Sequence, residues 1–97
     1  MRLAELIKGF DVECIGDDVD VSGLTADSRS VKERYVFAAL AGAKLSGKTF
    51  VKQAIESGAT VILSDEKQDV PEHLTQVIAK SPRSVLAKMA ARFYGKQ

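Results

Sequence analysis

Hydrophobic residues near the start of the chain recur first at helical and then at strand-like spacing. Leu3, Leu6 and Ile7 lie three and four positions apart, so residues 2–8 are predicted to form a short helix. Residues 16–18 are Gly-Asp-Asp and indicate a turn. Residues 19–25 then alternate apolar and polar side chains, which favours an extended strand.

Two continuous apolar runs in the middle of the chain predict strands that are covered on both faces. They span residues 35–40 and 60–63. Between them, residues 50–55 carry apolar side chains at helical spacing, and Gly58 follows as a glycine that ends a helix. A strand, a helix and a strand with short connections predict parallel pairing and a right-handed crossover.

The C-terminal third predicts one more strand and a longer helix. Residues 76–79 form a short apolar run. Ser81 and Pro82 are expected at the N-cap and in the first turn of the last helix, whose apolar stripe extends to Phe93. We expect Phe93 and Tyr94 to pack this helix against the sheet. The pattern as a whole predicts a small α/β sandwich.

Composition narrows the function classes. The chain has 97 residues, enough for one domain, and a net charge of +1 with no tryptophan, which argues against nucleic-acid binding. Neither a membrane-spanning run nor a signal-peptide core is visible, so we expect a cytoplasmic protein. The single cysteine, Cys14, is expected to be a small buried residue, and the single histidine, His73, a solvated loop residue, so no metal site is predicted.

Residues 42–49 spell G-x-x-x-x-G-K-T, the formal signature of an ATP phosphate loop. In that reading Lys48 reaches the phosphates and Thr49 ligates magnesium, while the apolar run that ends at Asp65 is the magnesium-side strand. Against it, only about two strands follow the loop, and no second catalytic group is recognisable. Thr49 as a helix N-cap and Lys48 as a solvated lysine explain the same residues. A minimal nucleotide-binding domain and a purely structural module stay open as alternatives.

An ordered series of short segments resembles the N-terminal domain of the Mur ligases from about residue 20 onward. The segments are Leu24-Thr-Ala-Asp-Ser-Arg29, Val36-Phe-Ala-Ala-Leu-Ala-Gly42, Gly47 with Phe50, Gln53-Ala-Ile55, Gly58-Ala59, Ser81-Pro-Arg83 and Met89-Ala-Ala-Arg-Phe-Tyr-Gly95. The last two look most like the MurE branch, which adds diaminopimelate or lysine to UDP-N-acetylmuramoyl-L-alanyl-D-glutamate. The MurF branch, which adds D-alanyl-D-alanine, shares the Asp-Ser-Arg region and is kept as an alternative.

The resemblance implies a fold and a role. The expected fold is a three-layer α/β sandwich with a small, mixed, mostly parallel sheet and helices on both faces. Residues 1–97 would form a single domain that recognises the UDP portion of the UDP-N-acetylmuramoyl dipeptide in a bacterial cytoplasmic ligase. ATP and Mg²⁺ would serve the full-length ligase through a central domain, and the amino acid would enter through a C-terminal domain. Both domains would be absent here, so the chain alone is expected to be inactive.

By motif position, the resemblance puts the contacts to UDP on Ala26 and Ser28 and on Ala43, Lys44 and Leu45. The Ser28 hydroxyl can bond to a uracil edge or a ribose, and Ala26, two residues back, is expected on the same strand face. Loop residues 43–45 follow a strand, at the usual ligand edge of an open α/β sheet, where Lys44 adds charge. A turn or cap role for Ser28 and a solvated role for Lys44 explain these two residues without a ligand.

Three further expectations concern the neighbours of these residues. Asp27 and Arg29 should point to the face opposite Ser28 and pair with each other or with a neighbouring residue. The family commonly has Pro-Gly where this chain has Glu33-Arg34, a change expected to cost only turn pre-organisation. Ser46 stands where the family commonly has Asp, and this departure touches the candidate ligand loop.

Overall fold

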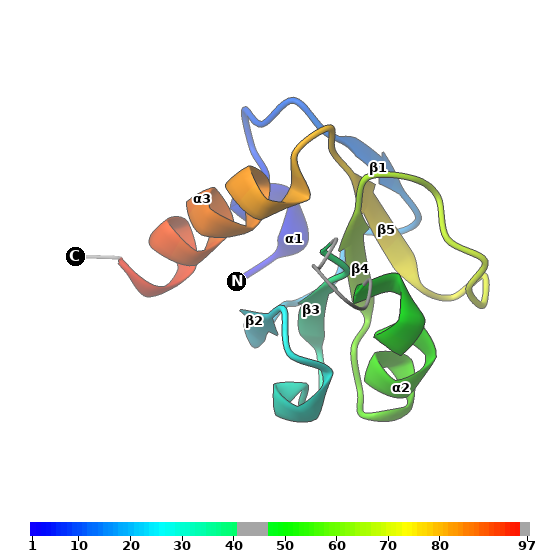
Figure 1. Cartoon of the computed structure of the whole chain (residues 1–97). Helices are drawn as coiled ribbons and strands as arrows, with labels where there is room; N and C mark the ends of the chain where they lie inside the picture. The colour runs from blue at the N-terminus through cyan, green and yellow to red at the C-terminus, as the bar shows by residue number, and fades with distance from the viewer. Residues whose placement is uncertain (41–46, 96–97) are drawn as a thin grey trace.

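A computed structural model describes residues 1–40 and 47–95 of the chain. It shows three layers, with α1 and α3 on one side of a five-stranded sheet and α2 on the other (Figure 1). The elements are α1 (Leu3–Leu6), β1 (Glu13–Ile15), β2 (Gly23–Thr25), the 3₁₀ turn η1 (Ser28–Ser30), β3 (Tyr35–Ala38), the 3₁₀ turn η2 (Gly47–Phe50), α2 (Val51–Glu56), β4 (Val61–Ser64), β5 (Thr75–Ile78) and α3 (Pro82–Tyr94). The three-layer α/β sandwich is therefore confirmed.

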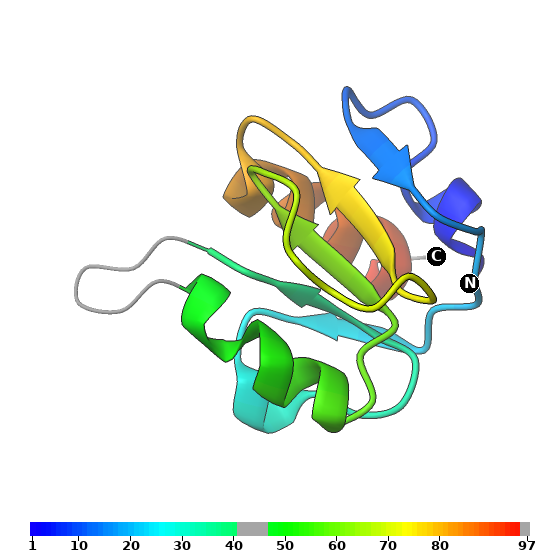
Figure 2. The ribbon, with the colours of Figure 1, turned by 90° about the vertical axis from the view of Figure 1, so that its right-hand side faces the viewer.

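The sheet is mixed and mostly parallel, as expected. Its strand order is β1-β5-β4-β3-β2, and the four strands from β2 to β5 run parallel to their neighbours. The edge strand β1 is antiparallel to β5. The strand–helix–strand unit from β3 through α2 to β4 has the predicted parallel pairing, with Val36 opposite Val61. Figure 2 shows α2 in front of the sheet and α3 behind it.

Alternate residues of the central strands contribute to two separate hydrophobic cores, one on each face of the sheet. On the α1 and α3 side, Val36, Val61 and Leu63 pack with helix residues such as Met89. On the α2 side, Phe37 and Ile62 pack against Ala54. Successive side chains on a strand point to opposite faces, so a strand that is buried on both faces is apolar throughout. This explains why continuous apolar runs predicted β3 and β4 correctly.

The predicted strand over residues 19–25 is only partly formed. Strand β2 begins at Gly23, and the first half of the segment pairs with the N-terminus instead. The Leu3 amide donates to the Val19 carbonyl at 2.8 Å, and the Val21 amide donates to the Met1 carbonyl at 2.7 Å. These two bonds use the backbone groups that a longer β2 would need, which shortens the strand.

Strand β1 was not predicted, and the expectation that Cys14 is buried was wrong. β1 is an edge strand with the sequence Glu-Cys-Ile, too short and polar to give a strand pattern. Cys14 is exposed there. Partial burial first, and the Asp18 carboxylate second, raise the pKa of its thiol. His73 is exposed in a loop, as predicted.

Helix α3 begins where the sequence predicted, but its N-cap residue does not cap it. The C-terminal end of the helix contacts the edge strand β2. Pro82 is in the first turn, and Ser81 occupies the N-cap position without a side-chain capping bond. Phe93 is half-buried against the core, as predicted. Tyr94 is 59% exposed, yet its hydroxyl accepts a hydrogen bond from the Leu24 amide of β2 at 3.3 Å.

Arg34 adopts a backbone conformation that favours glycine. Its φ is 62°, and the Tyr35 amide donates to the Lys32 carbonyl across the turn at 3.3 Å. A side chain in this left-handed region costs about 1–2 kcal/mol in backbone strain. The expectation that Glu33-Arg34 costs only pre-organisation was therefore incomplete, because Arg34 also carries this strain.

We expect Arg34→Gly to raise the free energy of unfolding by about 0.5–1 kcal/mol, since relief of strain exceeds the entropy that glycine adds to the unfolded chain. Arg34→Ala is the control, because it removes the same side chain and keeps the strain. Urea unfolding of the three proteins measures both effects. Equal gains in the two variants would assign the effect to the arginine side chain instead.

Candidate functional site

A surface hollow of about 460 Å³ lies beyond the carboxyl end of β2, between η1 and the start of α2. Its lining comes from two stretches of the chain: Ala26, Asp27, Ser28, Arg29, Phe50 and Gln53. In open α/β sheets, ligands bind outside the carboxyl ends of the strands. The structure thus brings Ala26 and Ser28 to one concave surface, at an edge of the sheet suited to a ligand.

The backbone path at these residues differs from the predicted strand. β2 ends at Thr25, and Ser28 begins the 3₁₀ turn η1. The Asp27 amide donates to Thr25 Oγ1 at 3.0 Å, and the Arg29 amide donates to Asp27 Oδ1 at 2.9 Å. Short polar side chains that bond to nearby backbone amides favour such turns over strands. The predicted alternation of faces from Ala26 to Arg29 was therefore wrong, and the capping role considered for Ser28 belongs to Asp27.

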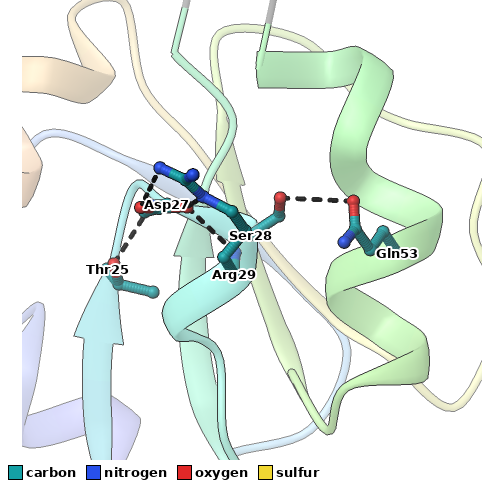
Figure 3. Close-up of polar contacts among 5 residues, drawn as sticks. All are labelled: Thr25, Asp27, Ser28, Arg29 and Gln53. Carbon is teal, nitrogen blue, oxygen red and sulfur yellow. Dashed lines mark hydrogen bonds and ion pairs between the residues drawn. The ribbon is translucent and has the colours of Figure 1, made fainter.

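Asp27 and Arg29 pair with each other, as predicted. Arg29 Nε donates to Asp27 Oδ1 and its Nη2 donates to Oδ2, both at 3.2 Å (Figure 3). The side-chain hydrogen bonds from Arg29, followed by its backbone amide, lower the pKa of the Asp27 carboxyl. Since a lowered pKa favours the ionised form in the folded state, the pair is intact at neutral pH and is lost as the pH falls through the folded-state pKa.

We expect Arg29→Met to raise the titration midpoint of the Asp27 carboxyl, because the guanidinium is removed while the capping amide remains. A carboxyl-carbon NMR titration measures this midpoint directly. Arg83→Met, at an exposed position of α3, is the matched control and should leave Asp27 unchanged. An unchanged midpoint in Arg29→Met would show that the backbone amide alone sets the Asp27 pKa.

Ser28 and Gln53 meet across the hollow. Ser28 is buried, and its hydroxyl donates to Gln53 Oε1 at 3.4 Å, although the residues are 25 positions apart (Figure 3). Phe50 lies three residues before Gln53, where the 3₁₀ turn η2 joins α2, and is half-buried. Gln53 and Phe50 were not predicted as site residues. Their three-residue spacing, which places side chains on one helical face, was the signal available in the sequence.

The other candidate contacts, Ala43, Lys44 and Leu45, lie outside the described residues, as does Ser46. The phosphate-loop reading is testable only at its end. Residues Gly47–Phe50 form a 3₁₀ turn, and α2 begins at Val51 with Phe50 as its N-cap. Thr49 is thus not the cap of this helix, which corrects the prediction.

Two other observations concern the described residues alone. Across positions 1–40 and 47–95, His, Cys, Asp and Glu side chains form no group of three that could hold a metal ion. In the same positions, no helix has the length and apolar character needed to cross a bilayer.

Comparisons with known proteins agree with one another. The family model described as "Mur ligase family, catalytic domain" matches residues 20–94. The diaminopimelate-adding UDP-N-acetylmuramoyl-L-alanyl-D-glutamate ligase of Caldanaerobacter subterraneus is 39% identical over 97 residues, covering 97% of this chain and 20% of that protein. The corresponding ligase of Alkaliphilus oremlandii is 40% identical over 96 residues, with 97% and 20% covered.

Among solved structures, MurF from Acinetobacter baumannii has a TM-score of 0.65 at 23% identity, covering 77% of this chain and 16% of that one. This likeness supports the fold. The chain spans about one fifth of the length of the curated relatives it matches.

Proposed function

The chain belongs to the Mur ligase family, and on this premise we propose that it holds the uridine diphosphate part of a UDP-N-acetylmuramoyl dipeptide. The proposed role is that of the N-terminal substrate domain, residues 1–97, in a cytoplasmic ligase of the MurE type. In this proposal ATP and Mg²⁺ act in a central domain of the longer ligase, and the amino acid enters through a C-terminal domain. We expect the 97-residue chain alone to give no ligation product.

The observation that carries the proposal is the hollow at the carboxyl end of β2. Two of the residues predicted from the sequence, Ala26 and Ser28, line it together. Ala26 is exposed, and its small side chain leaves room for a ligand to approach. Ser28 is buried and presents a hydroxyl that can both donate and accept. The volume of about 460 Å³ falls in the range typical of small-molecule sites, and four of the six lining residues carry polar groups that can orient a ligand.

The MurE type is favoured over the MurF type by the identity of the relatives. Proteins 39–40% identical over nearly the whole chain carry the name of diaminopimelate-adding ligases. The MurF structure is 23% identical and bears on the fold alone. The phosphate-loop alternative stays open, because the 3₁₀ turn at Gly47–Phe50 leads directly into α2, and the test below therefore includes magnesium-ATP.

Amide chemical-shift titrations with UDP and with magnesium-ATP test the proposal. We expect UDP to shift Ala26, Ser28 and Gln53, and Ser28→Ala to weaken UDP binding about fivefold, which corresponds to roughly 1 kcal/mol for one lost hydrogen bond. Ser30→Ala, an exposed serine of the same 3₁₀ turn, is the matched control and should bind like wild type. Shifts produced only by magnesium-ATP and centred on residues 47–49 would refute the proposal.

A further inference from the structure

A second concave surface lies on the other side of α2 from the hollow of Ala26 and Ser28. It is bounded by α2 and by the connection between β4 and β5, residues 65–74, on the same face of the sheet (Figure 2). Its volume is about 570 Å³, within the range of ligand sites. We call it the α2 groove, and the lining residues that matter below are Val51, Lys52, Ile55, Glu56, Asp69 and Pro71.

One wall of the α2 groove is fixed by a buried side chain of the sheet. Gln76 of β5 is 4% exposed, and its Oε1 accepts a hydrogen bond from the Gln68 amide at 2.7 Å. Its Nε2 donates to the Gln68 carbonyl at 3.2 Å. These two bonds hold the backbone next to Asp69 much as a neighbouring strand would. Binding therefore does not have to order this wall, which favours recognition by a preformed groove.

Apolar side chains from both sides line the α2 groove. Val51 and Ile55 contribute from α2, where Val51 is buried and Ile55 is half-buried. Pro71 contributes from the connection and is exposed. The apolar part of a ligand can therefore be removed from water here.

The charges of the α2 groove favour a cation. Glu56 and Asp69 are exposed, and within residues 1–40 and 47–95 neither has an ion-pair partner. Lys52 also lines the groove, so two carboxylates stand against one ammonium group. A ligand with a carboxylate would add to the excess of negative charge, whereas a cation would reduce it.

We infer that the α2 groove docks an arginine side chain from an extended peptide segment of a partner protein. Arginine has an apolar stem and a planar cationic head group with several N–H donors. The stem packs on Ile55 and Pro71, and the guanidinium donates to the carboxylates of Glu56 and Asp69. One side chain thus uses both the apolar surface and the unpaired charge of the groove.

A neighbouring hollow favours a peptide over a small free amine. This hollow has a volume of about 490 Å³ and is lined from β1 by Ile15. It shares Gln68, Asp69 and Pro71 with the α2 groove. Because the two adjoin along the same connection, an extended chain can cross it and place successive side chains in each.

The test uses two blocked peptides, acetyl-Ala-Leu-Arg-Leu-Ala-amide and the same peptide with citrulline in place of arginine. Citrulline keeps the shape of arginine and lacks its charge. In amide chemical-shift titrations of the 97-residue chain, we expect the arginine peptide to shift Ile55, Glu56, Gln68 and Asp69. It should bind about fivefold more tightly than the citrulline peptide, because its charge meets two exposed carboxylates.

Three variants assign this preference to the groove. Glu56→Gln and Asp69→Asn keep the size of each side chain and remove one carboxylate, and each should lower the preference to about twofold. Glu5→Gln is the matched control, because it removes an exposed carboxylate from α1, on the opposite face of the sheet. It should keep the full preference. All three positions are exposed, and a wild-type amide spectrum confirms that each variant is folded.

Four results would overturn the inference. They are equal binding of the two peptides by the wild-type chain, an equal loss of preference in Glu5→Gln, shifts that are absent or centred away from the groove, and binding of acetyl-arginine amide as tight as that of the peptide. The last result would indicate a site for a small amine. UDP binding is measured separately, so failure here leaves the proposed function in place.

Discussion

Replacing Gly58 by alanine is expected to lower the free energy of unfolding by about 3 kcal/mol, from backbone strain together with a steric clash. Gly58 follows α2 with a φ of +117°, a conformation that side chains rarely adopt. A Cβ atom there would lie 2.8 Å from Glu33 Cα and 2.9 Å from Glu33 N. These are backbone atoms, so the contact is relieved only if the turn moves.

That turn is held to Gly58 by a hydrogen bond. The Arg34 amide donates to the Gly58 carbonyl at 2.9 Å, just before β3 begins. A shift of the turn would strain this bond and disturb the entry to a central strand. We therefore expect Gly58→Ala to lower the free energy of unfolding by more than the strain of the positive φ alone would.

Gly9→Ala is the matched control, because Gly9 has a φ of +82° and a Cβ atom at this position would meet nothing within 4 Å beyond its chain neighbours. It should cost only about 1–2 kcal/mol, the strain of a left-handed residue. Urea unfolding of both variants gives the comparison. Equal decreases in the free energy of unfolding would mean that the turn moves away from the new Cβ atom at no cost, so that the clash at Gly58 contributes nothing.

Replacing Arg92 by alanine is expected to lower the free energy of unfolding by about 2 kcal/mol, because one guanidinium nitrogen donates to several backbone carbonyls. Arg92 Nη1 donates to the carbonyls of Glu5, Leu6 and Lys8, at 3.0, 3.2 and 2.9 Å. Carbonyls at the end of a helix lack partners within it, so Arg92 caps α1 from α3. The guanidinium also lies 4.5 Å from the centre of the Phe10 ring, in a cation–π contact.

Arg83→Ala is the control for this second variant, since Arg83 is an exposed arginine at the start of the same helix. It should change the free energy of unfolding by less than about 0.5 kcal/mol. Amide hydrogen exchange of α1 is a further readout, and Arg92→Ala should accelerate exchange there selectively. Equal stabilities of the two variants would show that water replaces Arg92 at these carbonyls without loss.

Several parts of the fold were predictable because they depend on neighbours along the chain. The apolar runs of β3 and β4 are predictable because a strand buried on both faces favours apolar residues at successive positions. Gly58 was predictable as a helix end because few other residues accept its φ. The pairing of Asp27 with Arg29 spans two positions and was also predictable.

The candidate site was predictable only in part. Ala26 and Ser28 were identified through the resemblance, and they lie together in the hollow. Their backbone conformation was not predicted correctly, because the hydrogen bonds that Thr25 and Asp27 accept from nearby amides favour a turn over the strand-like alternation. Gln53 was missed because its carboxamide gains a role only when α2 packs beside η1.

The sequence by itself determined the class of fold, the main buried strands, the last helix and the family, since periodicity and short motifs are properties of consecutive residues. Tertiary structure alone decided the antiparallel edge strand β1, the capping of α1 by Arg92 and the meeting of Ser28 with Gln53. Each of these joins residues far apart in the chain. Such contacts form only when the sheet and the helices pack, because local preferences carry no information about which distant surface a side chain will meet.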